Sequence, residues 1–216
     1  AGPEYFYFSD DQSPTFRSNP YFKYFCPIDG EKHLISLSES GLCELFVYEP
    51  KSFWNDLEYK VDESYWADSF KISFLRSDIE RKNLVRSKKG FVFIGREISE
   101  VSSYDFLVNP DDFIAVLDWW RAQKSPYEIV CLKEASKLGA KAHERVKQTF
   151  MSRSVSELSL HEIYLRTLGV TEEKLPYHSI IAFDEKAAIL HYQHKRLADK
   201  EGSVLLIDAG ASFCSY

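Results

Sequence analysis

The chain has 216 residues, enough for one large domain or two small ones, and its 44% hydrophobic content allows a core of useful size to be buried. The formal net charge of −6 argues against a nucleic-acid-binding surface, so we expect no nucleic-acid partner. No apolar run approaches the length of a transmembrane helix and no signal peptide opens the chain, so we expect no membrane partner either.

The cysteines and the first residues add two expectations. The four cysteines are scattered over the sequence without C-x-x-C spacing, at positions 26, 43, 131 and 214. Free, reduced thiols in the cytosol are the plainest interpretation, and we therefore expect a cytoplasmic protein. The sequence lacks an initiator methionine and begins at once with strongly patterned residues, so we expect a fragment that is cut at both ends.

The first half of the chain predicts a mixed α/β domain. Runs rich in branched and aromatic residues predict strands over residues 33–37, 43–48, 70–75 and 91–95. The turn signal Glu39-Ser40-Gly41 joins the first two runs as a hairpin. Asn109-Pro110 is typical of an N-cap followed by the first helical residue, and it predicts a helix that continues through Trp120.

Two helices are predicted after residue 124, where we place a domain boundary. Ser125, Pro126 and Glu128 form the pattern of a capping box, and apolar residues recur behind them at helical spacing over about 25 residues. A second helix is expected to begin near Ser156 and to end at Gly169, a residue type favoured at the position after a helix.

The strands that follow the helices carry the most informative residues. They are expected over residues 179–183, 188–192 and 204–207. The last strand runs into Asp208, followed by Ala209-Gly210, and a carboxylate at such a strand end can reach a metal ion without steric obstruction. His191 closes the strand before it, so we expect the histidine and the aspartate to lie on one sheet.

Several segments carry a recognisable pattern. Residues 121–135 are similar to R-x-x-K-s-x-x-E-i-x-x-l-r-x-A, residues 175–192 to Y-x-x-I-v-a-l-N-E-x-x-a-x-L-H-Y, and residues 204–211 to L-l-D-A-G-A. These patterns resemble the catalytic domain of pita-bread metallopeptidases. In the first half, residues 8–11 and 14–23 look like F-x-D-D-x-x-x-P-F-x-x-N-P-x-F-K. The combination is similar to bacterial Xaa-Pro dipeptidases, or prolidases, including those named organophosphorus acid anhydrolases.

The resemblance implies the fold class α/β (α+β). A creatinase-like α/β domain would cover residues 1–124, and the opening part of a pita-bread metallopeptidase domain would cover residues 125–216. The family implies two divalent metal ions, usually Mn²⁺ with Zn²⁺ or Co²⁺ as alternatives, held by two aspartates, one histidine and two glutamates. Asp208 matches the first aspartate, and the other ligands of the pattern would follow Tyr216. Without the resemblance, the plainer interpretation of Asp208 is a strand-end residue that caps a turn next to Gly210.

The resemblance also implies roles for residues around the metal. His191 would be catalytic, donating a hydrogen bond to substrate or to the developing oxyanion. Tyr177, Leu190, Asp11 and Trp54 would line the substrate pocket. The residues alone leave plainer interpretations open, because His191 also fits a core histidine bonded to a backbone carbonyl, and Asp11 and Trp54 fit a solvated turn and a packed core.

The implied activity is hydrolysis of Xaa-Pro dipeptides, with release of free proline, by a homodimer. The whole protein would be this metallopeptidase, and the 216-residue chain alone would be inactive because one carboxylate cannot hold two cations. An alternative from another class is a non-catalytic pita-bread module that binds peptides or proteins. A side activity on organophosphate triesters would use the same site.

Overall fold

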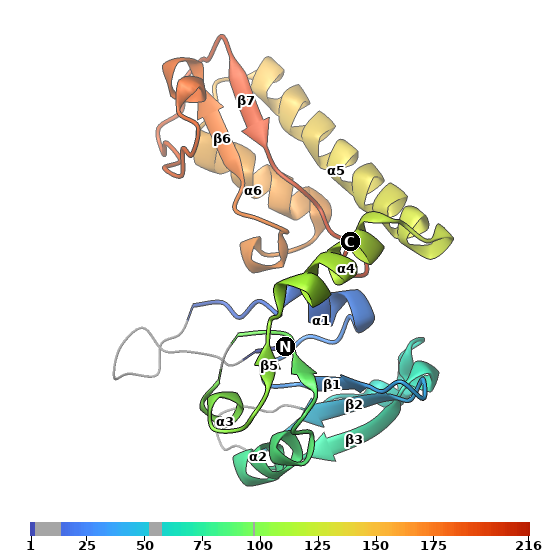
Figure 1. Cartoon of the computed structure of the whole chain (residues 1–216). Coiled ribbons are helices and arrows are strands. Elements are labelled where there is room, and N and C mark those ends of the chain that lie inside the picture. The colour runs from blue at the N-terminus through green and yellow to red at the C-terminus, as the bar shows by residue number, and fades with distance from the viewer. Residues whose placement is uncertain (3–13, 52–57, 97) are drawn as a thin grey trace. The chain divides into compact units, whose positions relative to one another are not determined.

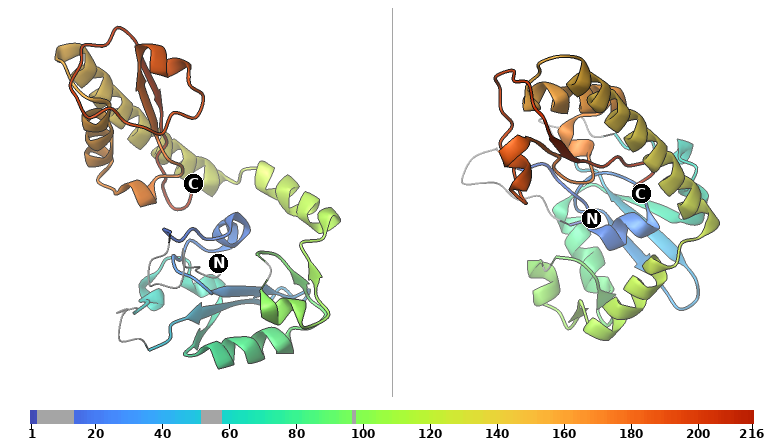
Figure 2. Two further views of the ribbon diagram at one scale, coloured as in Figure 1. Left: turned by 90° about the vertical axis from the view of Figure 1, so that its left-hand side faces the viewer. Right: turned by 90° about the horizontal axis from the view of Figure 1, so that it is seen from above.

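The computed structural model describes residues 1–2, 14–51, 58–96 and 98–216, and Figures 1 and 2 show its helices and strands. The chain divides into two compact units, residues 1–123 and residues 124–216. Within the described residues, no helix combines the length and the apolarity needed to cross a membrane.

The first unit is built on a small mixed sheet. Its strands are β1 (Leu34–Leu37), β2 (Cys43–Tyr48) and β3 (Lys71–Leu75), in that order across the sheet. The first two strands pair antiparallel, as the predicted hairpin requires, and β2 pairs parallel with β3. Leu45 and Val47 of β2 are fully buried in a cluster with Phe22 of α1 (Pro20–Phe25). Because side chains alternate along a strand, Phe46 and Tyr48 form a smaller cluster on the other face.

Further helices and two short strands complete the described part of this unit. They are α2 (Asp78–Ser87), β4 (Val92–Phe93), α3 (Ser99–Ser102), β5 (Leu107–Val108) and α4 (Asp111–Ala122), with single 3-10 turns at Val61–Glu63 and Ala67–Ser69. β4 and β5 pair parallel, so the strand predicted over residues 91–95 is present but shorter than expected.

The helix predicted at Asn109-Pro110 begins one residue later than expected. Pro110 is the N-cap of α4, and no side chain caps this end. Asn109 has a φ of 47°, and its amide instead pairs with the backbone of Gly95, accepting from the N–H at 2.9 Å and donating to the carbonyl at 2.8 Å. The asparagine is therefore used across the β4–β5 connection, and the sequence assignment of it as a helix cap was wrong.

The second unit, which is described throughout, combines two long helices with a two-stranded sheet. Its elements are α5 (Pro126–Ser152), α6 (Glu157–Leu168), β6 (Ile180–Phe183) and β7 (Leu205–Asp208), with 3-10 turns at Glu172–Lys174 and Asp184–Ala188. The capping box is confirmed, since Ser125 Oγ accepts from the Glu128 N–H at 3.3 Å and the Glu128 carboxylate accepts from the Ser125 N–H at 2.7 Å. Gly169 follows α6 with a φ of 71°, as predicted.

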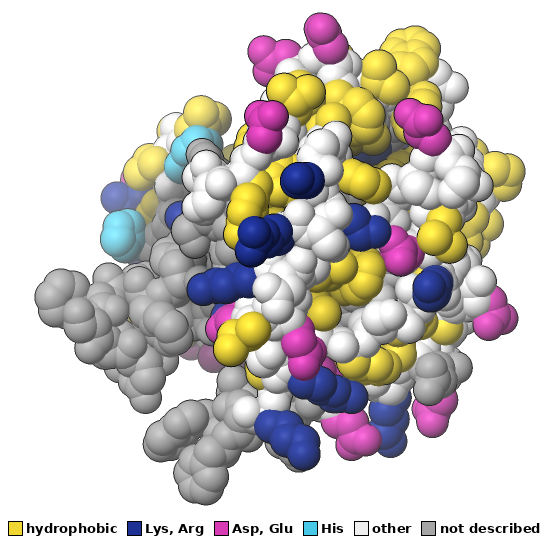
Figure 3. All heavy atoms as spheres, turned by 60° about the horizontal axis from the view of Figure 1, so that its bottom comes forward, with side chains coloured by type: hydrophobic (Ala, Val, Ile, Leu, Met, Phe, Trp, Pro, Cys, Tyr) yellow, Lys and Arg dark blue, Asp and Glu magenta, His cyan; other side chains and the backbone are white. Residues whose placement is uncertain are grey.

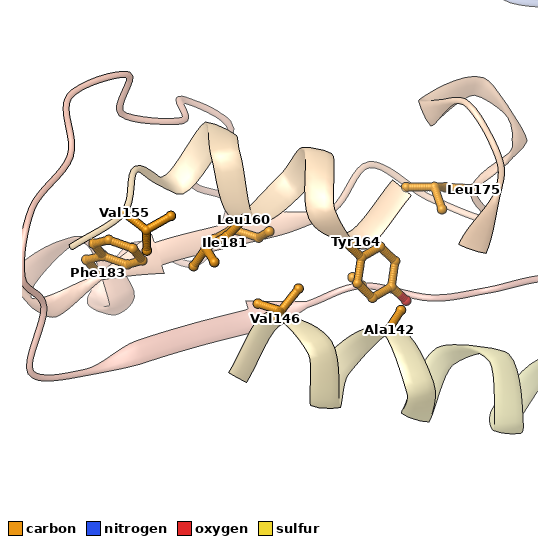
Figure 4. Packing of buried hydrophobic residues seen from close by; sticks show 9 residues of the cluster. Ala142, Val146, Val155, Leu160, Tyr164, Leu175, Ile181 and Phe183 are labelled. Atoms are coloured by element: carbon orange, nitrogen blue, oxygen red, sulfur yellow. The ribbon is translucent and has the colours of Figure 1, made fainter. Parts of the chain in front are cut away.

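Both faces of β6 are buried. One face packs against α5 and α6, and Figure 4 shows Ile181 and Phe183 pointing into that cluster. The labelled members of the cluster are Ala142, Val146, Val155, Leu160, Tyr164, Leu175, Ile181 and Phe183. Ile180 and Ala182 lie on the opposite face, where Tyr192 packs against them. A helix layer on one side and a loop on the other therefore enclose the strand that pairs with β7.

The strand predicted over residues 188–192 is absent, although all of these residues are described. Asp184 turns the chain out of β6 with a φ of 52°, and a 3-10 turn follows. The Asp184 carboxylate then accepts hydrogen bonds from the N–H groups of Ser203 and Val204, at 2.8 and 3.0 Å, as the chain returns to form β7 beside β6. The apolar run was misassigned because its buried member, Tyr192, covers the sheet instead of belonging to it.

Charges of both signs lie on the face shown in Figure 3. Among the side chains coloured there, those of Lys and Arg are interspersed with those of Asp and Glu and with hydrophobic ones. A nucleic-acid-binding face typically carries a continuous basic patch, and this face has a mixed pattern instead.

Candidate functional site

Asp208 is the last residue of β7 and lies at an accessible strand end. It is opposite Ile180 in the antiparallel register with β6. Its side chain is exposed, whereas Ala209 directly after it is buried against the helix-facing core. The strand therefore fixes the backbone on both sides of a carboxylate that remains open to a ligand.

Tyr177 is held against this carboxylate. Its hydroxyl donates a hydrogen bond to Asp208 Oδ1 at 2.8 Å. Leu175, two residues before it, is buried in the core, so the segment that carries Tyr177 is anchored. Partial burial, and then the hydrogen bond to Asp208, raise the pKa of Tyr177 above its usual range. The structure thus brings together two residues that the sequence analysis assigned to one site.

Gly210 makes this arrangement possible. A Cβ atom at this position would lie 2.7 Å from Pro176 Cγ and 3.0 Å from Tyr177 Cε1. Carbon atoms in contact are normally about 3.5–4.0 Å apart, so any larger residue would displace the Pro176-Tyr177 segment. The glycine of the Asp-Ala-Gly sequence is therefore needed for the approach of Tyr177, a role that the sequence analysis did not foresee.

His191 and Leu190 lie in an exposed turn after the 3-10 helix. Leu190 is 84% exposed and His191 is also exposed, so the core-histidine interpretation does not fit. The expectation that His191 and Asp208 share one sheet was wrong, because β7 pairs with β6 and the His191 segment forms no strand. Asp11 and Trp54 lie outside the described residues.

Asp208 is chemically suited to bind a metal ion. Asp208 supplies a hard carboxylate oxygen, and the hydrogen bond from Tyr177 engages Oδ1 and leaves Oδ2 available for a cation. Across the described residues, no group of three or more His, Cys, Asp or Glu side chains is placed to hold a metal ion. The described part of the chain thus fits one ligand of a metal site and does not form a complete one.

A second polar array in this unit was missed at the sequence level. Ser179 Oγ lies 2.7 Å from His161 Nδ1, and His161 Nε2 lies 3.5 Å from Glu172 Oε2. The order serine, histidine, carboxylate matches that of a nucleophilic triad. Ser179 is completely buried, however, so its hydroxyl is closed to a substrate. Burial also lowers the pKa of His161. The array therefore links α6 to the segment that precedes β6.

The sequence matches two known families along its length. Residues 1–119 match the family described as Xaa-Pro dipeptidase, N-terminal domain, and residues 130–216 match metallopeptidase family M24. The chain is 33% identical over 213 residues to a Xaa-Pro dipeptidase of Pseudoalteromonas atlantica, which covers 97% of this chain and 48% of that protein. It spans about half the length of the curated relatives that it matches.

Solved structures show the same fold at lower sequence identity. A histidine-to-alanine variant of Escherichia coli aminopeptidase P superposes with a TM-score of 0.74 at 20% identity, covering 99% of this chain and 54% of that one. A zinc-substituted form of the same enzyme in complex with product gives a TM-score of 0.72 at 19% identity, with the same coverage. The pita-bread fold class predicted from the sequence is confirmed by this likeness.

Proposed function

We propose, because the chain belongs to the Xaa-Pro dipeptidase family, that the full-length protein is a metal-dependent peptidase that releases proline from Xaa-Pro dipeptides. The family match covers the first unit, and the metallopeptidase match covers most of the second. Because the chain spans about half of its curated relatives, it would supply one part of the site.

The observation that carries this proposal is the end of β7. There an exposed carboxylate, Asp208, is held by the Tyr177 hydroxyl at 2.8 Å. A carboxylate that binds a metal is usually restrained by a further hydrogen bond, because an unrestrained ligand must be ordered each time the ion binds. We assign Asp208 as a metal ligand and Tyr177 as the residue that orients it.

Divalent ions bound at such a site would polarise the scissile carbonyl and lower the pKa of a water molecule. His191, which is exposed, would donate a hydrogen bond to substrate or to the oxygen on which negative charge develops. The bond before proline is a tertiary amide without an N–H, so recognition of the substrate has to rely on its carbonyl and on its ring. His191, as a hydrogen-bond donor, would recognise the carbonyl.

The pocket for the apolar parts of the dipeptide would include Tyr177 and Leu190. Tyr177 is 44% exposed as a residue and lies beside Asp208, and the apolar residue Leu190 is 84% exposed. Asp11 and Trp54 would complete the pocket, as the family pattern suggests. Removal of this apolar surface from water by the bound dipeptide would favour binding.

Several further properties of the full-length protein are suggested by the family pattern. They are a pair of ions, Mn²⁺ as the ion used, a homodimer, and a side activity on organophosphate triesters. Zinc substitution in a structural relative supports divalent-metal chemistry in general. A cytoplasmic location is supported by the four cysteines, which are all unpaired in the structure, as thiols in a reducing compartment are.

The test is Asp208→Ala in the full-length protein, with Asp199→Ala as the matched control. Asp199 is an exposed aspartate of the same unit outside the site. We expect Asp208→Ala to abolish hydrolysis of a Leu-Pro dipeptide and to lower the bound metal measured by elemental analysis, while Asp199→Ala leaves both unchanged. Full metal content and full activity in Asp208→Ala would refute the proposal. A wild-type protein that binds no metal and cleaves no dipeptide would favour the binding module instead.

A further inference from the structure

Glu157, the first residue of α6, is a fully buried carboxylate that binds parts of the chain distant in sequence. One oxygen, Oε1, accepts a hydrogen bond from the backbone N–H of Phe183 at 2.8 Å. The other, Oε2, accepts from the Tyr192 hydroxyl at 2.8 Å and from the backbone N–H of Arg196 at 2.7 Å. Hydrogen bonds to a carboxylate are stronger than those between neutral groups, so Glu157 is a firm anchor.

The segment that Glu157 holds has little regular structure of its own. Between the 3-10 turn that ends at Ala188 and the start of β7, the described backbone enters one isolated bridge, Val155 to Lys200. Beside the anchor, the Leu158 N–H donates to the Arg196 carbonyl at 3.2 Å. Hydrogen bonds to the start of α6 therefore hold this segment in place, although it forms no helix or strand of its own.

Tyr192 links this anchor to His191. Its ring packs against Ile180 and Ala182 on the outer face of β6, and 8% of the residue is exposed. Its hydroxyl, at the far end of the side chain, reaches Glu157. Both the ring and the hydroxyl of Tyr192 are held in this way. Because successive Cα atoms are only about 3.8 Å apart, Tyr192 also restrains the main chain of His191. His191 is exposed, and its imidazole remains accessible to a ligand.

We propose that Glu157 is a positioning residue that acts through Tyr192 to hold His191 where the peptide substrate reacts. The inference rests on the proposed function, because it requires that His191 meets substrate or the developing oxyanion. A hydrogen-bond donor aids catalysis most when it is held in place before the reaction, since no rearrangement is then needed. Glu157 itself, being completely buried, touches no substrate.

A neighbouring ion pair cannot replace this anchor. Lys195 of the same segment lies 3.9 Å from Glu172 Oε1, at the long limit of an ion pair, and the Glu172 side chain is 36% exposed. Partly exposed pairs at such a distance are screened by water and salt and restrain little. Two of the three hydrogen bonds of Glu157, those from Tyr192 and Arg196, therefore restrain the segment directly, and the third, from Phe183, ties the carboxylate to β6.

The experiment uses Tyr192→Phe in the full-length protein, which keeps the ring and removes the hydroxyl. The matched control is Tyr164→Phe, the same change at a fully buried tyrosine of α6 whose hydroxyl has no hydrogen-bond partner among the described residues. Backbone hydrogen exchange over residues 190–196 reports the anchor, and kcat for a Leu-Pro dipeptide is measured with and without a second change, His191→Ala.

We expect Tyr192→Phe to raise exchange over residues 190–196 about tenfold and to lower kcat about tenfold, with metal content unchanged. In the His191→Ala background it should cause no further loss of kcat, because Glu157 and Tyr192 act through His191. The Tyr164→Phe control should change neither measurement.

Two results would overturn the inference while the proposed function stands. These are unchanged exchange in Tyr192→Phe, and an equal loss of kcat with and without His191, which would mean a general structural role. A wild-type protein that cleaves no Xaa-Pro dipeptide would instead overturn the proposed function and, with it, the role of His191. The exchange measurement separates that failure from a failure of the anchor.

Discussion

Replacing Gly210 by alanine should destabilise the second unit, whereas the same change at Gly139 should stabilise it. The added Cβ at Gly210 would lie 2.7 Å from Pro176 Cγ and 3.0 Å from Tyr177 Cε1. Relief of these contacts requires a shift of roughly 1 Å in the Pro176-Tyr177 segment or at the end of β7. An added Cβ at Gly139, inside α5, would lie 3.9 Å from Ala211 Cβ, which is ordinary van der Waals contact.

The two changes should differ in sign and be separable in size. Overpacking of a tight site costs about 1–3 kcal/mol. Replacing glycine by alanine inside a helix gains about 0.5–1 kcal/mol, because the unfolded glycine has more freedom to lose. The two variants should therefore differ in free energy of unfolding by about 1.5–4 kcal/mol. The lost Tyr177–Asp208 hydrogen bond adds little, since both side chains are exposed.

The assay is urea unfolding of the chain, followed by far-UV circular dichroism, which detects the helices of both units, with α5 of the second unit as the longest. All four tryptophans precede residue 124, so tryptophan fluorescence reports the first unit as an internal control that should not change. A Gly210→Ala midpoint equal to or above that of the wild type would refute the reasoning, because it would mean that the end of β7 is not packed against Pro176 and Tyr177 as described.

Three further changes probe the folding of each unit. Burial lowers the pKa of His33 to about 4, so the unfolded chain binds a proton at this residue more readily than the folded one. The stability of the first unit should therefore be full above about pH 6.5 and should fall by about 3 kcal/mol as the pH drops towards 4. Tryptophan fluorescence during urea unfolding at each pH measures this change. Gly30→Ala should destabilise this unit by at least about 2 kcal/mol, because the φ of Gly30 is +120° and the new Cβ would overlap the Tyr59 hydroxyl. Gly41→Ala, at a φ of +80° in open space, should cost only about 1 kcal/mol. Equal losses of stability in the two variants would contradict this account. Ser125→Ala should cost about 1 kcal/mol of the second unit's stability by circular dichroism, and no change would mean that the capping box contributes nothing.

The sequence by itself determined the features that depend on neighbouring residues. Ser125 and Glu128 are three positions apart, so the capping box forms within one helical turn and needs no distant contact. Gly169 ends α6 because glycine adopts the left-handed conformation at little cost, and this too is local. The family pattern likewise pointed to Asp208, because the strand end and the small residues behind it are continuous in sequence.

Only the tertiary structure decided which distant groups meet. The run over residues 188–192 has the apolar composition of a strand, but it does not pair with β6. Instead, the Asp184 carboxylate accepts hydrogen bonds from the N–H groups of Ser203 and Val204, and the residues that follow form β7, antiparallel to β6. Glu157 lies in the first turn of α6, where an acidic residue is favoured by local position alone, yet it is buried with donors that lie up to 39 residues away. Tyr177 meets Asp208 across 31 residues of sequence. Local propensity contains no term for such contacts, because their free energy is set by packing and by the shared burial of donor and acceptor.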